Sequence, residues 1–484
     1  MDDLYSSKTA LFYIFNLIVG AGSLTLPRAF YDAGWVLSSV LIVVLALFSY
    51  ITVTFVIESI ALCSSIIQWR MVERMKKVTR EIRSAAEGEM ASEDEMEINE
   101  DALMLPQEYI DFFPSEPQRL FSLDNKVELG EMALLLFNKL GLTLFYIFLC
   151  LYLYGDLTIY SAVISKTIVT TVCTSDNLNS TLSDYCWTSY DFKRGAVYKM
   201  ALSGVLFILG PFVFFNIQKT KYLQFLTIFS RLLAFVLMIG LCIKRLANPN
   251  VEHGQPPQYN FEGFPALLGS CVYSFMCHHS LPGLIVPIMN KSKLKRWIAL
   301  DYIAILILYL TLALVAVFAF NKIEDLFTLN FPPDTLKPNL TKDLISYFLM
   351  LFPVFTFSTT FPIVSVTLRS NLQAMFIFWQ YKYIHTLIIP VITVVPPVLL
   401  AMTTDKIENH VGITGSFAGI VVQYIIPAGL VILARQQIPP LLKNVSNPHS
   451  SPFKTIFWPI LVLTWAVICI AFAIINITLH KHIE

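Results

Sequence analysis

Stretches of about 20 consecutive apolar residues recur along almost the whole chain. A helix of that length crosses the hydrocarbon core of a bilayer, and helices satisfy their own backbone hydrogen bonds there. The pattern predicts an all-α polytopic membrane protein that forms one transmembrane domain over residues 1–484. Eleven spans are predicted, at residues 8–30, 34–63, 131–172, 196–215, 223–243, 264–289, 297–320, 343–368, 386–402, 411–435 and 455–478.

Two of these spans have unusual lengths. Residues 131–172 are too long for one perpendicular helix, so this span is either tilted or begins in the cytosol. Residues 386–402 are short and contain Pro390, Pro396 and Pro397. A core helix or a re-entrant loop is therefore the alternative for that segment.

The balance of charge excludes several classes of protein. Charged residues make up 14% of the chain, whereas soluble proteins contain about 25%. Lys and Arg number 34, and Asp and Glu also number 34. The chain therefore lacks the excess of basic residues that is typical of proteins that bind nucleic acids. The sequence contains no phosphate-binding loop, nucleophile elbow or zinc-protease motif. We expect no enzyme activity, no metal, and no cofactor other than a bound sodium ion.

Basic residues in the short loops predict the orientation in the membrane. With a cytosolic N-terminus, the cytosolic loops contain Arg70, Arg74, Lys76, Lys77, Arg80, Arg83, Lys219, Lys221, Lys291, Lys293, Lys295, Arg296, Lys443 and Lys454. Eleven spans then place the C-terminus outside the cytosol. Residues 173–195 and 321–342 become extracytosolic loops.

Those two loops carry residues typical of an extracytosolic compartment. Asn179 and Asn339 begin glycosylation sequons. Cys173 and Cys186 share one loop, and we expect a disulfide between them, with two free thiols as the alternative. The sequons fit the plasma membrane and lysosomes or other endomembranes equally.

Residues 68–127 form the one long polar stretch of the sequence. It begins basic and becomes acidic through Glu93, Asp94, Glu95, Glu97, Glu100 and Asp101. Few of its residues suit a core, so we expect a largely disordered cytosolic loop. The loop is either a solvated spacer or a binding site for a cytosolic partner.

The first span contains the sequence Gly20-Ala21-Gly22, followed by Pro27. Glycine is a poor helix former and proline lacks a backbone donor, so the helix is expected to break here. A break frees backbone groups at membrane depth, which is costly unless they line a polar cavity. The segment is therefore either an unwound ligand site or a close contact between helices.

The sixth span is interrupted in a similar way, by His278-His279-Ser280 and Pro282-Gly283. Broken helices at corresponding places in two halves indicate a midplane site in a transporter with inverted repeats. The N-termini of half-helices favour a carboxylate, and unwound carbonyl groups favour a cation. Together they predict a site for a zwitterion such as an amino acid.

The eighth span carries three consecutive hydroxyl side chains, Ser358, Thr359 and Thr360. With carbonyl groups of the first helix they are able to complete an alkali-cation site. The alternative is that each hydroxyl bonds to the backbone of its own helix.

Ionisable residues inside the spans are functional candidates, because burying charge in a bilayer is costly. Asp156 is either a proton carrier or the partner of Arg231 in an ion pair, and the pair is favoured slightly. Arg231 is otherwise a fixed cation at the place of a sodium ion. His278 and His279 either respond to acidity or make hydrogen bonds that satisfy the helix break.

These motifs resemble the amino acid/auxin permease family, which includes sodium-coupled neutral amino acid transporters. Residues 16–27, followed by Ala33-Gly34, are similar to the signature with which members of that family begin. Residues 274–278, followed by Pro282, are similar to the family's motif in the sixth span. Further strings resemble one branch of that family: residues 152–157, 218–224, 271–277, 279–282 and 351–356. The resemblance covers nearly the whole chain apart from residues 68–127.

The resemblance implies a LeuT-like fold, with five helices inverted against five and an eleventh helix added. It implies secondary active transport of amino acids. Asn16 and Thr359 match sodium-site residues, with Ser358 beside them. The substrate site would contain Gly20, Ala21, Gly22, Ser274, Phe275 and Cys277. His279 departs from the family pattern, which has a proline there.

Two main functions follow from these features. The first is a secondary amino-acid transporter that works by alternating access, with substrate movement coupled to sodium through Asn16, Ser358 and Thr359 or to protons through Asp156. The second is an amino-acid sensor or non-transporting receptor that signals through the cytosolic loop. A channel-like or structural membrane protein is a third, weaker possibility.

Overall fold

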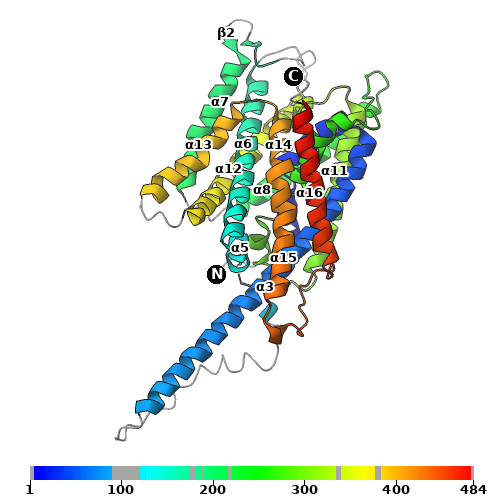
Figure 1. The fold of residues 1–484 in the computed structure, drawn as a ribbon. Coiled ribbons are helices and arrows are strands. Elements are labelled where there is room, and N and C mark those ends of the chain that lie inside the picture. The colour runs from blue at the N-terminus through cyan, green and yellow to red at the C-terminus, as the bar shows by residue number, and fades with distance from the viewer. Residues whose placement is uncertain are drawn as a thin grey trace.

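The computed structural model describes residues 5–89, 120–125, 127–173, 181–187, 190–215, 221–333, 340–376 and 383–480. These residues form a helical polytopic membrane protein (Figure 1). The first part of the chain contains α1 (Ser7–Ile18), α2 (Ala21–Ala33), α3 (Trp35–Glu89), α5 (Leu129–Leu136), α6 (Lys139–Val172), the hairpin β1 (Tyr185–Trp187) and β2 (Tyr190–Lys193), α7 (Arg194–Leu209), η3 (Gly210–Phe214) and α8 (Lys221–Leu246).

The second part contains η4 (Phe261–Gly263), α9 (Phe264–Ser274), α10 (Leu281–Ile285), α11 (Leu294–Ala319), η5 (Phe327–Asn330), α12 (Leu340–Met375), η6 (Ile384–Ile388), α13 (Ile389–Ala401), α14 (Ile407–Thr414), η7 (Gly415–Gly419), η8 (Val421–Ile425), α15 (Ile426–Gln437), η9 (Pro440–Leu442) and α16 (Phe457–His480). The elements η6, η7 and η8 are π-helical turns inside longer helices.

Nine helices among the described residues are long and apolar enough to cross a membrane. The helices α1 and α2 form a tenth span, bent by 50° at a short break. Residues 264–289, predicted as one span, contain α9 and α10, each too short to cross alone. The predicted interruptions of the first and sixth spans are therefore present as helix breaks.

Two predicted boundaries need correction. The expectation of disorder from residue 68 is wrong for residues 68–89, because α3 continues to Glu89. The sequence has no Gly or Pro between Trp35 and Gly88, so nothing in it stops the helix earlier. The long third span is divided into the short α5 and the 34-residue α6, where Phe137 and Asn138 leave the helical conformation.

The proline-rich ninth segment is a helix rather than a re-entrant loop. Residues 384–401 form a continuous span of 18 residues. Pro390 lies just after the π-helical turn η6, and Pro396 and Pro397 lie inside α13.

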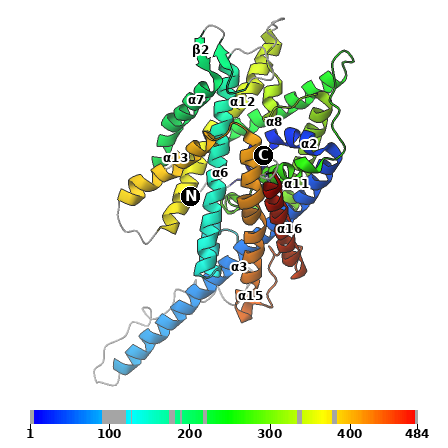
Figure 2. The ribbon, with the colours of Figure 1, turned by 45° about the horizontal axis from the view of Figure 1, so that its top comes forward.

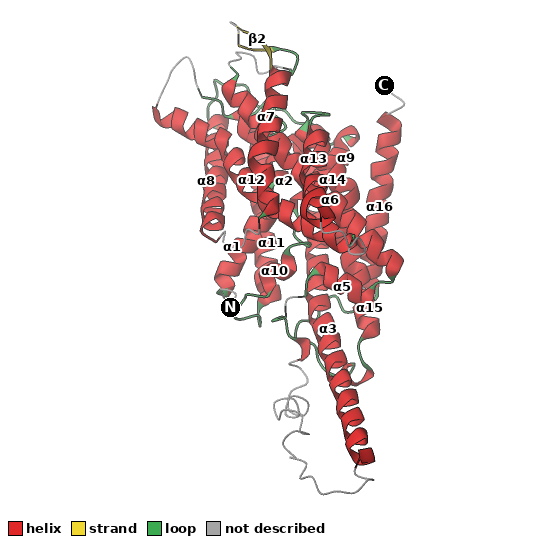
Figure 3. Ribbon diagram, turned by 90° about the vertical axis from the view of Figure 1, so that its left-hand side faces the viewer, coloured by secondary structure: helices red, strands yellow, loops and turns green. Residues whose placement is uncertain are grey.

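The two ends of the bundle differ in what they carry (Figure 3). The start of α1 and the projecting half of α3 lie at one end. The hairpin and the end of α16 lie at the opposite end. A disulfide joins Cys173 after α6 to Cys186 in β1, with 4.6 Å between their Cα atoms. Asn179 and Asn339 lie outside the described residues.

The helix α6 runs through the middle of the bundle and contacts α7, α12, α13 and α14 (Figure 2). Glycines allow several helices to approach closely. A Cβ atom at Gly155 of α6 would lie 2.3 Å from the Thr414 side chain of α14. One at Gly269 of α9 would lie 2.3 Å from the carbonyl oxygen of Gly412. Glycine is needed at these contacts because any side chain would separate the helices.

The loop before α16 is fixed by a partly buried ion pair. Arg435 of α15 donates two hydrogen bonds to the carboxylate of Glu58 in α3, at 2.9 and 2.7 Å. The backbone N–H of Ser451 also donates to Glu58, at 2.9 Å. Arg435 further donates to the carbonyl groups of Phe453 and Lys454. This network connects α3, α15 and the loop.

Candidate transport site

The helix break in the first span lies at Val19 and Gly20. The α1 helix ends at Ile18, which leaves the last carbonyl groups of that helix without helical donors. Arg231 of α8 is buried and donates from Nη1 to the carbonyl oxygens of Asn16 and Val19. The positive guanidinium thus lies at the negative end of the α1 dipole, where a cation is stabilised.

The second helix break covers residues 275–280, between α9 and α10. The hydroxyl of Tyr309, from α11, lies 3.1 Å from the carbonyl oxygen of Ser274 and 3.2 Å from that of Ile18. A hydroxyl has one proton, so it donates to one of these carbonyl groups at a time. Ser49 of α3 donates to the carbonyl oxygen of Phe275 at 3.2 Å. The two breaks are therefore connected through Tyr309.

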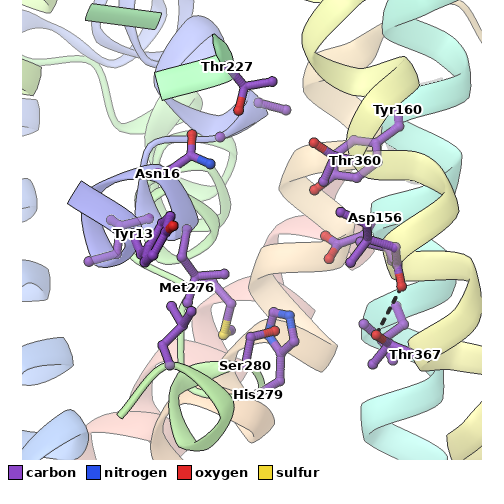
Figure 4. A pocket seen from close by; sticks show the side chains of 18 of the residues that line it. Tyr13, Asn16, Asp156, Tyr160, Thr227, Met276, His279, Ser280, Thr360 and Thr367 are labelled. Carbon is purple, nitrogen blue, oxygen red and sulfur yellow. Dashed lines mark hydrogen bonds between the residues drawn. The ribbon is translucent and has the colours of Figure 1, made fainter. Parts of the chain in front are cut away.

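A cavity of about 300 Å³ lies beside both breaks (Figure 4). It is enclosed by α1, α2, α6, α8, α12 and the segment from α9 to α10. Its polar lining residues are Tyr13, Asn16, Tyr152, Asp156, Tyr160, Thr227, Arg231, Tyr273, His279, Ser280, Thr359, Thr360 and Thr367. Leucine, isoleucine, valine and methionine side chains line the rest.

Two oppositely charged side chains line this cavity without pairing to each other. No ion pair between Asp156 and Arg231 occurs among the described residues, so the favoured expectation of such a pair is wrong. Arg231 instead contacts the broken end of α1. Asp156 is 3% exposed, and its Oδ1 atom has no hydrogen-bond partner in the described part of the chain. The cavity therefore contains an acceptor that a cationic ligand is able to use.

Two further polar atoms beside the cavity are buried and unpartnered, counting only the residues that the structure describes. They are Oδ1 of Asn16 and Nδ1 of His279. The imidazole of His279 lies 5.4 Å from the ring of Tyr152, measured between centroids. Figure 4 shows Asn16 on one side of the cavity, Asp156 on the other, and His279 near Ser280. Buried polar atoms without partners are costly, and a polar ligand in the cavity would satisfy them.

Eight of the candidate site residues from the sequence line the cavity. They are Asn16, Gly20, Ala21, Asp156, Arg231, His279, Thr359 and Thr360. Gly20 and Ala21 place the first helix break in the cavity wall. Six other candidates, namely Gly22, Ser274, Phe275, Cys277, His278 and Ser358, are not among its lining residues.

The two glycines of the first break differ in their surroundings. A Cβ atom at Gly20 would have nothing within 4 Å, so this glycine faces open space. A Cβ atom at Gly22 would lie 2.5 Å from Oγ of Ser274 and 2.8 Å from its Cα atom. Gly22 is therefore a helix–helix contact between α2 and α9. The interpretation as a close helix contact applies to Gly22, whereas Gly20 lines the cavity.

The side chains expected at the second break point elsewhere. Ser274 donates to the carbonyl oxygen of Ser270 in its own helix, at 2.7 Å. Cys277 lies 3.3 Å from the hydroxyl of Tyr302, and Nε2 of His278 lies 2.8 Å from Oγ1 of Thr52. Because α9 ends at Ser274, the helical phase is lost after it, and sequence spacing no longer predicts which side chains face the cavity.

Phe275 is also directed away from the cavity. Its ring is fully buried between the rings of Tyr302 and Tyr309, with centroids 5.9 and 5.4 Å away. It packs the break against α11. The cavity is lined instead by Tyr273, Met276, His279 and Ser280, which sequence reasoning did not assign to substrate binding.

Two of the three hydroxyls of the eighth span bond to their own helix. Thr359 and Thr360 both donate to the carbonyl oxygen of Thr356, at 2.8 and 2.9 Å. Two carbonyl groups of the first helix, those of Asn16 and Val19, accept hydrogen bonds from Arg231. Several components of the expected sodium site are thus engaged with other groups, whereas Oδ1 of Asn16 has no partner among the described residues.

Tyrosines of the cavity wall were missed by the sequence analysis. Tyr152, Asp156 and Tyr160 are spaced four residues apart on α6, which places them on one helix face. That spacing around a buried acid was a usable signal. Tyr13 and Tyr273 carry no comparable signal, since they join the wall only through the packing of α1 and α9.

Comparison with known proteins agrees with this architecture. A family model described as transmembrane amino acid transporter protein matches residues 5–65 and 149–476. The unmatched interval contains the projecting half of α3 and α5. A transmembrane protein 104 homolog of Drosophila melanogaster is 41% identical over 98% of this chain and 97% of its own. Transmembrane protein 104 of Homo sapiens is 41% identical over 99% and 98%, and the Dictyostelium discoideum homolog is 33% identical over 97% and 96%.

The matches cover both helix breaks and every element that lines the cavity. The branch resembled by residues 152–157 and 271–277 is that of these relatives. The chain therefore belongs to the transmembrane amino acid transporter protein family, in the branch of the transmembrane protein 104 relatives.

Proposed function

We propose that this chain is a secondary active transporter of amino acids that works by alternating access. The observation that carries the proposal is the cavity beside two broken helices, lined by a carboxylate and a guanidinium that do not pair. A zwitterion has a complementary charge for each of them. The family match supports an amino acid as the substrate class.

The transport cycle is a rearrangement of half-helices around the cavity. In a LeuT-like arrangement, α1–α2 and α9–α10 are the first and sixth spans of two inverted five-helix repeats. Glycine contacts such as Gly22 against Ser274 hold α2 to α9. The short helices α1 and α10 contact each other on the other side of the breaks. Movement of this second pair would open the cavity to one side of the membrane.

The same N-terminal region links α1 to α10. The backbone N–H of Tyr5 donates to the carbonyl oxygen of Pro287 at 3.0 Å, and that of Met289 donates to Tyr5 at 3.1 Å. The Tyr5 hydroxyl donates to the carbonyl oxygen of Leu284, which lines the cavity. These bonds make α1 and α10 a single moving unit in the proposed cycle.

We infer that coupling uses protons and not sodium. The guanidinium of Arg231 already supplies positive charge at the carbonyl groups of Asn16 and Val19. A second cation there would be repelled, because two like charges a few ångströms apart interact strongly in a protein interior. Asp156 is the acidic residue among the cavity's lining residues and is the proposed proton carrier.

The proposed orientation places the N-terminus in the cytosol and the C-terminus outside it, in the plasma membrane or in lysosomes or other endomembranes. The disulfide between Cys173 and Cys186 supports this, because disulfides persist in oxidising compartments. The projecting half of α3 would then lie in the cytosol.

The test is flux in liposomes that contain the purified protein. The twenty amino acids are first screened by thermal shift, and those that stabilise the protein are tested for uptake under imposed ion gradients. We expect unchanged uptake when choline replaces sodium, and uptake that responds to a pH gradient. Stimulation by sodium would refute the proposed coupling, and binding without flux would refute transport.

A variant pair on α8 gives a sharper test of Arg231. Arg231→Gln is expected to reduce uptake at least ten-fold, because it removes the charge at the α1 break. Arg245→Gln is the matched control on the same helix, since Arg245 lies outside the cavity and donates to the carbonyl oxygen of Ala319. Equal uptake by both variants would contradict the role of Arg231.

A sensor that signals through the cytosolic side is the second candidate. The feature that favours it is the projecting half of α3, a continuous helix from the bundle to Glu89. Replacing residues 90–119 by a Gly-Ser linker of equal length separates the two functions. A transporter should keep its flux, whereas a sensor should bind its amino acid but lose its cytosolic partner.

A further inference from the structure

We propose that the carboxylate of Asp156 binds the ammonium group of the substrate, and that the chain exchanges protons for amino acids instead of carrying both in one direction. This inference rests on the proposed function and specifies how the same cavity recognises its substrate. The argument has three steps: most backbone carbonyl groups at the breaks are engaged, the Oδ1 atom of Asp156 has no hydrogen-bond partner among the described residues, and a proton uses the same oxygen atoms as the ammonium group.

Backbone carbonyl groups at the two breaks are the first candidates for holding an ammonium group. In this chain most of them already accept hydrogen bonds. Asn16 and Val19 accept from Arg231, and Ser274 and Ile18 share the hydroxyl of Tyr309. The carbonyl groups of Phe275, Cys277 and Gly20 accept from Ser49, from the N–H groups of Ser280 and Leu281, and from Ser23, respectively.

A carbonyl oxygen has a second lone pair, so one hydrogen bond does not by itself exclude an ammonium group. At the α1 break, the positive charge of Arg231 excludes the ammonium group. An ammonium group on Asn16 or Val19 would share its acceptor with a guanidinium, and both charges would be buried. Like charges at such a distance repel by several kcal/mol in a low-dielectric interior. The substrate cation therefore binds elsewhere in the cavity.

Two side-chain oxygens of the cavity lack a partner among the described residues, Oδ1 of Asn16 and Oδ1 of Asp156, and of these two groups the carboxyl of Asp156 is the one that can carry a negative charge. Its carboxylate projects into the cavity from α6, opposite Asn16 (Figure 4). Its Oδ1 atom is buried without a partner among the described residues. The rings of Tyr152, Tyr160 and Tyr273 line the same part of the wall, and aromatic faces attract ammonium groups.

The ionisable groups that line the cavity with Asp156 come from four places. Tyr152 and Tyr160 lie on α6 itself, and Tyr273 lies on α9; Tyr152 and Tyr273 hydrogen-bond with the carboxyl group of Asp156. His279 of the second break and Arg231 of α8 also line the cavity. The lining residues from α12 are threonines and apolar side chains, while α7, α13 and α14 contribute none of the lining residues. Asp156 is thus the one acidic side chain of this cavity wall.

The other end of the substrate has a separate place. The helix α2 has 13 residues and begins at Ala21, so its first N–H groups face the break without helical acceptors. A carboxylate is stabilised there by the dipole of α2 and by the nearby charge of Arg231. Gly20 leaves room for it, because a Cβ atom there would have nothing within 4 Å. The zwitterion then spans the cavity from α2 to α6.

Exchange follows from the use of one carboxylate by two cations. The ionised group accepts the ammonium group, whereas a proton on an oxygen of Asp156 makes the group neutral and removes that attraction. One proton bound corresponds to one ammonium group released, so charge at Asp156 is balanced in each state. An ionised carboxylate with no cation beside it is costly at membrane depth. The cavity therefore changes its accessibility when Asp156 holds either the ammonium group or a proton, and does not change it when Asp156 holds neither. Substrate therefore moves one way and a proton the other.

The experiment uses the full chain in liposomes with a trapped pH dye and an amino acid identified by thermal shift. Exchange predicts that an acidic interior accelerates uptake and that uptake makes the interior more alkaline. Cotransport predicts slower uptake with an acidic interior. Competition between the proton and the ammonium group for Asp156 also predicts the pH dependence of binding. Once Asp156 is mostly protonated, the apparent Kd of the amino acid should rise about ten-fold for each unit by which the pH is lowered. The N-acetyl derivative, which lacks the ammonium group, should not bind.

Variants of two buried acids complete the test. Asp156→Asn should lose binding at least 100-fold, and Asp156→Glu should keep part of it. Asp301→Asn is the matched control, because Asp301 of α11 is 7% exposed but does not line the cavity. If Asp156→Asn does not fold, the sign of the pH effect on the wild-type chain decides the question.

The possible outcomes separate this inference from the function on which it rests. An absence of any amino-acid binding or flux by the folded wild-type chain would refute the proposed function. Flux that an acidic interior slows, or full affinity in a folded Asp156→Asn variant, would overturn the exchange mechanism and leave a transporter. Binding of the N-acetyl derivative with equal affinity would also overturn it.

Discussion

Substituting alanine at Gly22 and at Gly20 should have opposite consequences, although the two glycines are two residues apart. At Gly22 the added Cβ atom would lie 2.8 Å from the Cα atom of Ser274 and 2.9 Å from a ring carbon of Tyr273. The first of these is a backbone atom, so a change of rotamer cannot relieve the contact. At Gly20 nothing lies within 4 Å.

The expected magnitudes follow from these distances. Overpacking of a tight contact costs about 1–3 kcal/mol, and the backbone contact at Gly22 favours the upper part of that range. Higher helix propensity of alanine offsets up to about 1 kcal/mol, so Gly22→Ala should lose about 1–2 kcal/mol of stability. Gly20 has a φ of −113°, which any L-residue adopts, so Gly20→Ala should be neutral or slightly stabilising.

The assay is thermal unfolding of purified protein, followed by uptake normalised to folded protein. Gly22→Ala should lower Tm, and Gly20→Ala should leave Tm unchanged while its methyl group reduces uptake. Gly20→Val should abolish uptake and still fold. A Tm for Gly22→Ala equal to that of the wild-type chain would refute the assignment of Gly22 to a helix contact. Normal uptake by Gly20→Val would refute the assignment of Gly20 to the site.

Three further changes test the parts of the fold that surround the site. Glu58→Ala leaves the guanidinium of Arg435 without its carboxylate, which should lower the free energy of unfolding by about 3 kcal/mol and lower Tm. An unchanged Tm would show that the pair contributes nothing to stability. Changing Cys173 and Cys186 to serine removes the disulfide and opens a loop with a sequence separation of 13. The free energy of unfolding should fall by about 3 kcal/mol in the same assay. Stability equal to that of the wild-type chain would contradict this. Burial lowers the pKa of His449 to about 4, with a smaller effect of nearby lysines. The unfolded chain then binds a proton more readily below about pH 6.5, so stability should fall from pH 6.5 towards pH 4, and His449→Asn should lose less over that interval.

Hydropathy was sufficient to predict the membrane class and most of the helices, because the length of a span is fixed by the thickness of the bilayer. Glycine and proline in the first and sixth spans predicted where those helices break. The boundary of α3 was missed because polarity was read as disorder. Residues such as Arg74 and Lys77 are good helix formers, and the chain contains no residue that stops the helix before Gly88.

The lining of the cavity was predicted in part, and the errors have two causes. Gly20, Ala21 and Asp156 were identified because helix breaks and buried charge are visible in a sequence. Cys277 and Phe275 were misplaced because the helical phase ends at Ser274. The partner of a buried charge depends on tertiary packing, so spacing alone did not show that Arg231 reaches the end of α1.

The length of α3 has a mechanical consequence for any signal that leaves the membrane. Its 55 residues form one helix about 80 Å long, of which the last 24 or so extend about 35 Å past the last buried apolar residue, Ile66. Between Ile66 and Gly88, the residue before its last, the helix contains no glycine or proline, so it can act as a lever with its fulcrum in the bundle. A tilt of about 5° at the fulcrum displaces Glu89 by about 3 Å. In the proposed orientation, small adjustments around the cavity would thereby become movements of several ångströms on the cytosolic side of the membrane.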